Sequence, residues 1–354
     1  MIPSFDKIHL KFKLNGTNYN HDELKEVSYS LVKEGEAYEK VVGNFLLDWL
    51  DDKDFVLVKT SGSTGIPKTV KLKKQAMVNS AVMTGDFFGL KPGDTALHCL
   101  PSRYIAGKMM LVRAMILGLE LQLVSPTTMP AYDDQTPYDF CAMIPLQLKN
   151  SLDRLTCIDT LIVGGATVSK SLRLALKDVH TTVFETYGMT ETVSHIAVRQ
   201  LNKISEAESH FQTLPNVVIS QDDRQCLVIE AEKLSEAKVI TNDIVELVTP
   251  TAFDIIGRFD NMINSGGVKL FPELIESKLQ DKIDLPFFIT SEADKDLGQK
   301  LVLVLEGATN DLNSTVFDEL DKFEVPKEIY SIPKFIQTET GKLQRQKTLE
   351  AIIG

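Results

Sequence analysis

Short apolar runs alternate with amphipathic stretches through the first half of the chain, and this alternation constrains the fold most. The runs begin with FVLVK at residues 55–59 and end with TTVFETYG at 181–188. Helical patterns separate them, beginning at Lys74 and covering residues 108–118 and 169–177. Strands that alternate with helices are typical of layered α/β folds with largely parallel sheets. We therefore expect an α/β protein.

The pattern changes near residue 215 to strands without long helices: NVVIS, CLVIEAE, KVITNDIVELV and FDIIGR. Their alternating apolar residues predict a small antiparallel sheet or β-barrel-like region. After GRFDNMINSGG (257–267) helices and strands alternate again, including a helix expected around Val316 to Phe323. We expect a large N-terminal domain of residues 1–258, with layered α/β sheets and the barrel-like region. Residues 259–354 would form a small, mobile α+β domain.

The composition excludes several classes of partner. A net charge of -11 disfavours general binding to nucleic acid or anionic membranes, which requires a positive surface. The N-terminus has no apolar core of signal-peptide length, and no later stretch approaches the roughly 18 apolar residues of a membrane span. We expect a cytoplasmic protein without membrane insertion. The cysteines lie in or beside apolar runs and are expected to be free thiols: Cys99, Cys141, Cys157 and Cys226.

The stretch TSGSTGIPKT (60–69) brings together hydroxyl groups, glycines and a lysine, which suit a phosphate-binding loop. From Gly62 it nearly fits the Walker pattern, but Pro67 stands where that pattern requires its second glycine. Pro67 has no N–H, and residues 69–73 alternate like a strand where a Walker loop continues into a helix. A hairpin therefore fits better, either as a phosphate cradle or as a flexible polar tip.

Four further motifs follow in order: TLIVGGATVS (160–169), TYGMTET (186–192), GRFDNMINSGGVKLFPELIE (257–276) and TGKLQR (340–345). Together with TSGSTGIPK they resemble the acyl-adenylate-forming superfamily of AMP-dependent synthetases and ligases. The resemblance covers about residues 55–345. Thr69 replaces the glycine usual after the loop lysine, and Asn242 replaces the glycine of the family's T-G-D. The chain before the loop is also shorter than usual, so part of the family's N-terminal domain is expected to be missing.

This resemblance implies an ATP-dependent acid-CoA ligase that works in two steps. A carboxylate attacks the α-phosphate of ATP to give an acyl-adenylate and pyrophosphate, and the thiol of CoA then displaces AMP. The partners implied are a small carboxylic acid, ATP, Mg²⁺ and CoA. Because both reactants of the first step are anions, the site must supply positive charge and aligned donors.

The resemblance also assigns the residues of the first step. Glu191 would ligate Mg²⁺, which prefers carboxylate and phosphate oxygens, and Thr190 would contact the α-phosphate. Lys342 would be the catalytic lysine that bridges the attacking carboxylate and the α-phosphate. Taken alone, Glu191 could be a solvated acid or helix cap, and Lys342 a solvated lysine. The β- and γ-phosphates would be held by Thr60, Ser61, Gly62, Ser63, Thr64, Gly65 and Lys68.

Further motif residues are assigned to the nucleoside. Tyr187 would stack on adenine, unless it is an ordinary core aromatic. Asp243 would accept both ribose hydroxyl groups with support from Arg258, unless these are a turn aspartate and a surface arginine. The adenine and ribose site would comprise Gly164, Gly165, Tyr187, Gly188, Asp243 and Arg258.

The glycine-rich segment after Arg258 is expected to act as an interdomain hinge. By resemblance, the small domain turns about Asp260 between an adenylating and a thioester-forming arrangement. The turn Ser265-Gly266-Gly267 would then approach the thiol channel. A simple linker is the alternative interpretation.

The acid is suggested by LPSRYIAGKMMLVRAMILG (100–118), which resembles the acyl-pocket segment of o-succinylbenzoate-CoA ligases of menaquinone biosynthesis. Tyr104 stands where those enzymes usually have histidine. Arg113 would pair with a second, non-reacting carboxylate, a task that suits a guanidinium group. Arg113 could instead be a surface arginine on an amphipathic helix. The alternatives for the whole chain are another aryl- or acyl-CoA ligase, a free-standing adenylation enzyme, or a non-catalytic nucleotide-binding relative.

Overall fold

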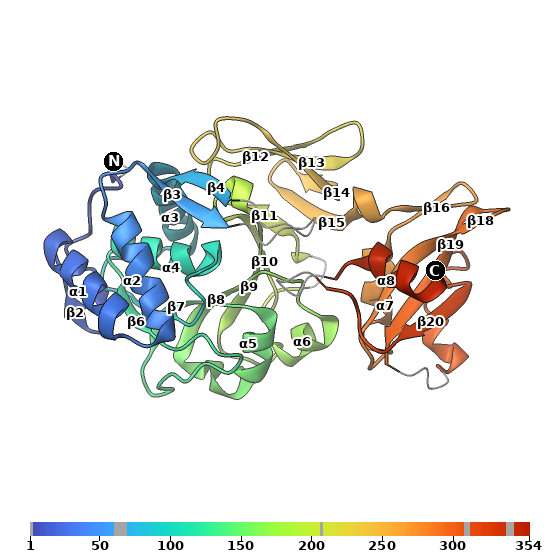
Figure 1. Ribbon diagram of the computed structural model, residues 1–354, viewed down its shortest axis with the longest axis horizontal. Helices are drawn as coiled ribbons and strands as arrows, with labels where there is room; N and C mark the ends of the chain where they lie inside the picture. The colour runs from blue at the N-terminus through green and yellow to red at the C-terminus, as the bar shows by residue number, and fades with distance from the viewer. Residues whose placement is uncertain (1–2, 60–68, 206–207, 308–311, 338–342) are drawn as a thin grey trace.

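The computed structural model describes residues 3–59, 69–205, 208–307, 312–337 and 343–354 (Figure 1). Thirteen of the described strands form one continuous sheet in the order β12-β13-β14-β15-β11-β10-β9-β8-β7-β5-β6-β1-β2. They are β1 (Lys13–Leu14), β2 (Thr17–Asn18), β5 (Thr95–His98), β6 (Glu120–Leu123), β7 (Tyr138–Met143), β8 (Ile158–Val163), β9 (Thr182–Gly188), β10 (His195–Gln200), β11 (Phe211–Thr213), β12 (Val218–Gln221), β13 (Cys226–Glu230), β14 (Val239–Thr249) and β15 (Ala252–Arg258).

The centre of this sheet is parallel, as the sequence predicted. Strands β6, β5, β7, β8 and β9 pair in parallel, and helices α4 (Ile105–Leu117), α5 (Pro145–Asn150) and α6 (Lys170–Ala175) connect successive strands. The chain passes from β5 to β6 on one side and then returns to place β7 on the other side. In open α/β sheets, ligands bind beyond the carboxyl ends of the strands at such a reversal.

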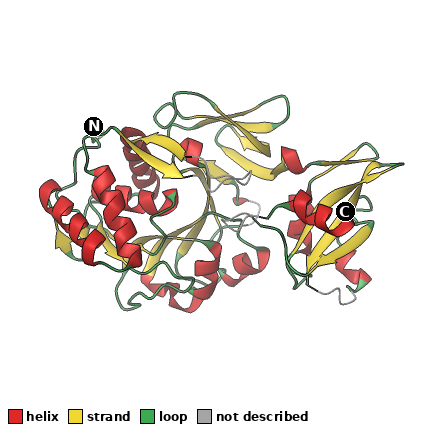
Figure 2. Cartoon of the chain, in the orientation of Figure 1, coloured by secondary structure: helices red, strands yellow, loops and turns green. Residues whose placement is uncertain are grey.

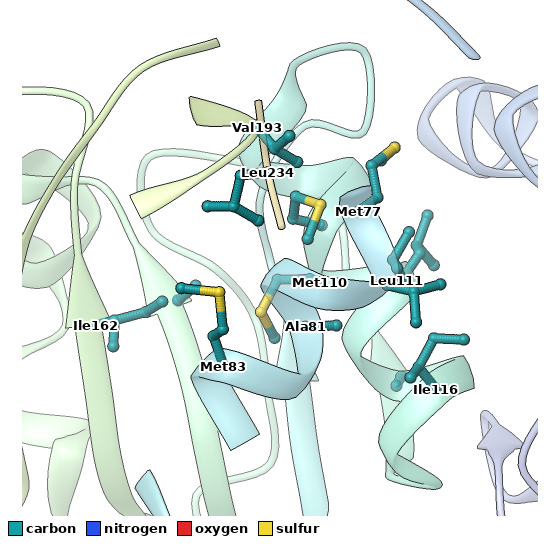
Figure 3. Packing of buried hydrophobic residues seen from close by; sticks show 14 of the residues in the cluster. Met77, Ala81, Met83, Met110, Leu111, Ile116, Ile162, Val193 and Leu234 are labelled. Atoms are coloured by element: carbon teal, nitrogen blue, oxygen red, sulfur yellow. The ribbon is translucent and has the colours of Figure 1, made fainter. Parts of the chain in front are cut away.

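Helices cover both faces of the parallel strands. Successive strand residues point to opposite faces, so Ala96 packs with α4 and α3 (Lys74–Phe88), whereas Leu97 packs with α5 and α6. Figure 3 shows the first of these interfaces, where Met83 of α3 and Met110 of α4 lie beside Ile162 of β8. The result is a three-layer α/β/α arrangement, which confirms the expected fold class.

The strands between residues 211 and 258 are antiparallel, as predicted, but they continue the main sheet. Strand β11 pairs with β10 through Ala197 and Thr213, and with β15 through Phe211 and Phe253. This double pairing joins the antiparallel region to the parallel strands. The short strand β11 thereby brings β14 and β15 next to the end of β9.

The hairpin predicted around the hydroxyl-rich loop is confirmed. Strands β3 (Phe55–Lys59) and β4 (Thr69–Lys73) pair antiparallel as a separate two-stranded sheet, and α3 follows directly. The buried Nζ of Lys74 donates to the carbonyl oxygen and to Oδ1 of Asp51, both at 2.8 Å. This contact ties the start of α3, directly after the hairpin, to the residues that follow α2 (Ala37–Trp49), a helix that packs against α1 (His21–Glu34).

The last part of the chain has its own sheet and its own hydrophobic clusters, which contain residues only from Ile263 onward. Figures 1 and 2 show it at one end of the molecule. The helix expected around Val316 to Phe323 is wrong, because only a 3₁₀ turn, Ser314–Phe317, forms there, and β-branched Thr315 and Val316 disfavour a helix. The remaining elements are β16 (Ile263–Ser265), β17 (Val268–Leu270), α7 (Pro272–Leu279), β18 (Phe287–Asp294), β19 (Gly298–Glu306), β20 (Glu328–Ile332) and α8 (Arg345–Ile353).

Two other expectations concern the whole chain. All four cysteines are free, as predicted, and three of them are buried. Within the described residues, no helix has the length and apolar character needed to cross a bilayer.

Candidate active site

Asp243, Arg258 and Tyr187 come together at the junction of the parallel and antiparallel strands. The register of β14 and β15 places Asp243 directly opposite Arg258. Arg258 Nη1 donates to Asp243 Oδ1 at 3.0 Å, and Tyr187 Oη donates to Oδ2 at 2.6 Å. The structure therefore brings both predicted ribose-binding residues into one hydrogen-bonded group.

Tyr187 is more deeply placed than its predicted role suggests. Only 9% of its surface is exposed, and its ring packs edge-on against Phe211 and Phe253 at centroid distances of 6.0 and 5.4 Å. Burial and the neighbouring Asp243 raise the pKa of the phenol, so the hydroxyl stays protonated and donates. Stacking on adenine stays a prediction, whereas the orientation of Asp243 by Tyr187 was not foreseen. Nothing local in the sequence signals a pair separated by 56 positions.

The glycines of the two central motifs are explained by close packing. A Cβ on Gly188 would lie 2.3 Å from the carbonyl oxygen of Ser194 and 2.4 Å from Cα of His195. A Cβ on Gly164 would lie 2.3 Å from Oγ1 of Thr186, and Gly165 has a φ of +88°. The loop after β8 and the end of β9 therefore approach each other more closely than other residues allow.

Thr190 and Glu191 lie on a 3₁₀ turn, Thr190–Thr192, directly after β9. Glu191 is exposed to solvent, and within the described residues no group of three or more potential ligands gathers around it. A single carboxylate still fits Mg²⁺, because this ion commonly takes one or two carboxylates together with substrate phosphates and water. Magnesium ligation by Glu191 stays a prediction.

Val193 ends this turn in a strained conformation. Its φ is +67° and its ψ is -50°. These angles place Val193 at the centre of a three-residue turn, which is closed by a hydrogen bond from Ser194 N to Thr192 O at 2.7 Å. Positive φ is rare for a β-branched residue and costs conformational energy. The side chain is nonetheless buried, and Figure 3 shows it beside Met77 and Leu234. Packing therefore holds a turn that the backbone disfavours.

Arg113 is a buried cation, so it is not a surface arginine. It is 2% exposed, and within the described residues its guanidinium group contacts only neutral side chains. Nε donates to Thr84 Oγ1 at 3.3 Å, and Nη2 donates to Ser194 Oγ at 2.9 Å. Burial lowers the pKa of Arg113 to about 9. A buried charge without a counterion is unfavourable, so this position suits an anionic ligand.

His195 completes the cluster of Thr84, Arg113, Ser194 and His195, which we call the Arg113 cluster. Burial and the adjacent Arg113 hold the pKa of His195 well below its usual value, so the ring is neutral. Nδ1 lies 3.3 Å from Arg113 Nη2 and must accept, which leaves the proton on Nε2, 3.4 Å from Thr84 Oγ1. The sequence identified Arg113 alone, because its partners come from two other segments of the chain, Thr84 on α3 and Ser194 with His195 at the start of β10.

The Arg113 cluster adjoins the TYGMTET motif, since Gly188 lies against the backbone of Ser194 and His195. Tyr104, the second predicted acyl-site residue, is at the other end of the same helix. It caps α4, is 37% exposed and lies under the guanidinium group of Arg103 at 4.7 Å. Nine residues separate it from Arg113, about 14 Å along a helix axis, so the structure does not bring the two together.

The predicted hinge segment is held to β14. Asp260 lies on a 3₁₀ turn, Phe259–Asn261, and accepts from Asn242 Nδ2 at 3.0 Å. Ser265 ends β16, and Gly266 and Gly267 form the turn to β17 with φ values of +59° and +89°. The turn itself therefore requires these glycines.

Two groups of predicted residues lie outside the described residues, namely Lys342 and the phosphate loop Thr60, Ser61, Gly62, Ser63, Thr64, Gly65 and Lys68.

The chain is similar to known proteins over most of its length. The AMP-binding enzyme family model matches residues 20–224, more than half of the chain. The 2-succinylbenzoate-CoA ligase of Escherichia coli K12 is 23% identical, over 92% of this chain and 77% of that protein. The ligase of the same name from Listeria monocytogenes EGD-e is 24% identical, over 95% of this chain and 76% of that protein.

Two solved structures share the fold. The acyl-CoA synthetase (AMP-forming)/AMP-acid ligase II-like protein of Dyadobacter fermentans is 37% identical, with a TM-score of 0.60. The alignment covers 92% of this chain and 98% of that one. The o-succinylbenzoate coenzyme A synthetase of Bacillus subtilis, in complex with ATP and magnesium ion, has a TM-score of 0.73 at 18% identity, over 92% and 82%.

Proposed function

This chain belongs to the AMP-binding enzyme family and is an AMP-forming acid-thiol ligase, and we propose that it joins o-succinylbenzoate to coenzyme A. The first step would form o-succinylbenzoyl-AMP and pyrophosphate, and the second would transfer the acyl group to CoA and release AMP. This reaction would place the enzyme in menaquinone biosynthesis.

The observation that carries this choice of acid is the buried Arg113. O-Succinylbenzoate has two carboxylates, of which one reacts with ATP and the other remains an anion. A guanidinium group that is 2% exposed and has only neutral partners within the described residues would gain a counterion from that second carboxylate. The named activity of the relatives from Escherichia coli and Listeria monocytogenes supports the same acid.

The nucleoside would lie against the group formed by Tyr187, Asp243 and Arg258. Asp243 keeps spare acceptor capacity, because each of its oxygens accepts one hydrogen bond in the structure. Both ribose hydroxyl groups could therefore donate to it without displacing Tyr187 or Arg258. Gly164 and Gly165 would border the adenine and the acyl group, as their position beyond β8 allows.

The charged reactants would be brought together by residues from both ends of the site. Mg²⁺, held through Glu191 and the phosphates, would supply positive charge at the leaving pyrophosphate. Thr190 would donate to the α-phosphate. We propose that Lys342 stabilises the α-phosphate during attack and that the loop from Thr60 to Lys68 holds the outer phosphates.

We further propose a division into residues 1–258 and 259–354, with Asp260 as the hinge. The separate hydrophobic clusters beyond Ile263 support this division. In the second step, the turn Ser265-Gly266-Gly267 would face the thiol of CoA. Tyr104, exposed at the start of α4, would border the acyl entrance.

The test is pyrophosphate release from ATP and Mg²⁺ with a panel of acids, with and without CoA. The decisive pair is o-succinylbenzoate and benzoylpropionate, which differ only by the second carboxylate. Release with the first acid and little with the second, followed by thioester and AMP when CoA is present, would support the proposal. Equal use of both acids would remove the assigned role of Arg113. Binding of ATP without release from any acid would favour a nucleotide-binding relative instead.

A further inference from the structure

Asn242 stands where the resembling family has a glycine, and the structure uses its side chain. Nδ2 donates to Oδ2 of Asp260 at 3.0 Å, and Oδ1 accepts from Nη1 of Arg224 at 2.9 Å. Glycine has neither group. Asn242 therefore makes a link between β14 and the turn after β15 that a glycine in this position could not make.

The orientation of the Asn242 amide follows from its two partners. Arg224 has only donors and the carboxylate of Asp260 has only acceptors, so the oxygen must face Arg224 and the nitrogen must face Asp260. Arg224 is itself fixed, because Nε donates to Asp222 Oδ2 at 2.8 Å and Nη2 donates to the carbonyl oxygen of Thr241 at 3.1 Å. The donor that holds Asn242 is thus anchored to the turn between β12 and β13 and to β14.

The β14–β15 register explains why Asn242 reaches the hinge. Asp243 pairs with Arg258, so the preceding residue on β14 faces the residues that follow Arg258. Arg258 adds a second path, because Nη1 contacts Asp243 at 3.0 Å while Nη2 lies 3.7 Å from Asp260. Asp260 is therefore joined to the candidate nucleotide site from two sides.

We propose that Asn242 is a positioning residue that holds Asp260 on β14 and thereby stabilises the arrangement of the small domain seen in this structure. The inference rests on the proposed function, because the hinge role of Asp260 does. Both partners are partly exposed, with 59% of the Asp260 side chain accessible. A hydrogen bond of this kind shifts an equilibrium by roughly fivefold, so domain rotation can still break it.

The kinetic test compares the two half-reactions, which are acid-dependent pyrophosphate release and thioester formation from supplied acyl-AMP and CoA. Asn242→Gly should change the ratio of the two rates by about fivefold, because one arrangement loses its hydrogen bond. Asn242→Asp should change it further in the same direction, since a second carboxylate repels Asp260. Asn216→Gly is the control, because Asn216 is an exposed turn residue with a φ of +65°.

A second readout needs no substrate. Spin labels on cysteines introduced at the exposed Lys149 and Lys322, in a Cys157→Ser background, report the distance between the large and small domains. Asn242→Gly should broaden or shift this distance distribution, and Asn216→Gly should not. An unchanged distribution, or an equal loss in both half-reactions, would overturn the proposal. If no acid supports pyrophosphate release, the proposed function fails while the distance measurement still decides whether Asn242 holds the hinge.

Discussion

At the scale of single residues, the most informative feature is a buried arginine that has only neutral contacts within the described residues. Thr84, Ser194 and His195 orient the guanidinium group of Arg113 without neutralising it. Burial of an ion costs several kcal/mol when no opposite charge compensates it. Such an arrangement is expected where a ligand supplies the missing charge. A substitution that removes the charge of Arg113 should therefore lower activity without lowering stability.

Arg113→Met should abolish the preference for the dicarboxylate without unfolding the protein. We expect kcat/KM for o-succinylbenzoate to fall by about 100-fold, the effect of losing a buried charge pair worth about 3 kcal/mol. The value for benzoylpropionate should change little. The midpoint of thermal unfolding should stay the same or rise, because an uncompensated charge is removed. A large drop in the midpoint with equal losses for both acids would indicate a structural role instead.

His98 makes a second residue-scale prediction, on pH and stability. The ring is 2% exposed at the end of β5, its Nε2 lies 2.8 Å from Ser102 Oγ, and its Nδ1 has no partner within the described residues. Burial lowers the pKa of His98 from 6.5 to about 4. As the pH falls, His98 therefore binds a proton in the unfolded state before it does so in the folded state. The stability that the neutral, buried ring contributes is complete above pH 6.5 and is lost as the pH falls towards 4.

The loss amounts to about 3 kcal/mol of unfolding free energy over that range. His98→Leu should flatten the pH dependence of the urea midpoint between these values, whatever it does to the stability at neutral pH. His180→Leu, at an exposed position, is the control and should leave the slope as in the original chain. Identical slopes in all three proteins would show that His98 is already protonated or accessible in the folded state.

At the scale of elements, the turn that follows β9 links two parts of the site. Thr190 and Glu191 precede Val193, and Ser194 and His195 follow it, so one strained residue connects the motif to the Arg113 cluster. The surrounding side chains from α3 and from Leu234 hold Val193 in place. Strain kept by packing is common where a site must present side chains in fixed directions.

This strain predicts an unusual order of stability. Val193→Ala keeps the positive φ and loses buried methyl groups, whereas Val193→Gly loses more apolar surface but relieves about 1 to 2 kcal/mol of backbone strain. The glycine variant should therefore be at least as stable as the alanine variant in urea unfolding. At Val198, buried in the regular strand β10, glycine should be the less stable of the two. The same order at both positions would argue against strain at Val193.

At the scale of the whole molecule, the proposed chemistry requires residues from both proposed domains. Tyr187, Asp243 and Arg258 lie on strands of the large sheet, and Thr84 and Arg113 lie on helices that cover it, whereas Lys342 comes after β20 in the sequence. Among the described residues, the hydrophobic clusters of these two parts of the chain are separate. Proposed rotation about Asp260 would let one chain perform two steps with different requirements.

Lys342→Ala should separate these two steps. We expect acyl-adenylate formation to fall by about 1000-fold, because a charge at the transferring phosphoryl group is lost, as for other electrostatic contacts of this type. Conversion of supplied acyl-AMP and CoA to the thioester should stay close to that of the unaltered enzyme. Lys334→Ala, eight residues earlier on an exposed surface, is the control. Equal losses in both steps would defeat the role assigned to Lys342.

Much of the fold followed from short-range patterns. Short apolar runs separated by helical patterns predicted the central parallel strands, and Pro67 with the alternating residues 69–73 predicted a hairpin rather than a Walker loop. The motifs predicted that Asp243 and Arg258 would act together, and the β14–β15 register places them opposite each other. These features depend on local conformational preferences, which neighbouring residues in the chain largely determine.

Local patterns in the sequence thus predict the fold class, the family and the candidate site residues. Three features are not predictable from these patterns: β11 joins the antiparallel strands to the main sheet, Tyr187 orients Asp243, and Arg113 is buried among neutral partners. Each of these depends on contacts between segments far apart in the chain, and such contacts are set by packing. Local sequence patterns do not predict which distant side chain will fill a given space.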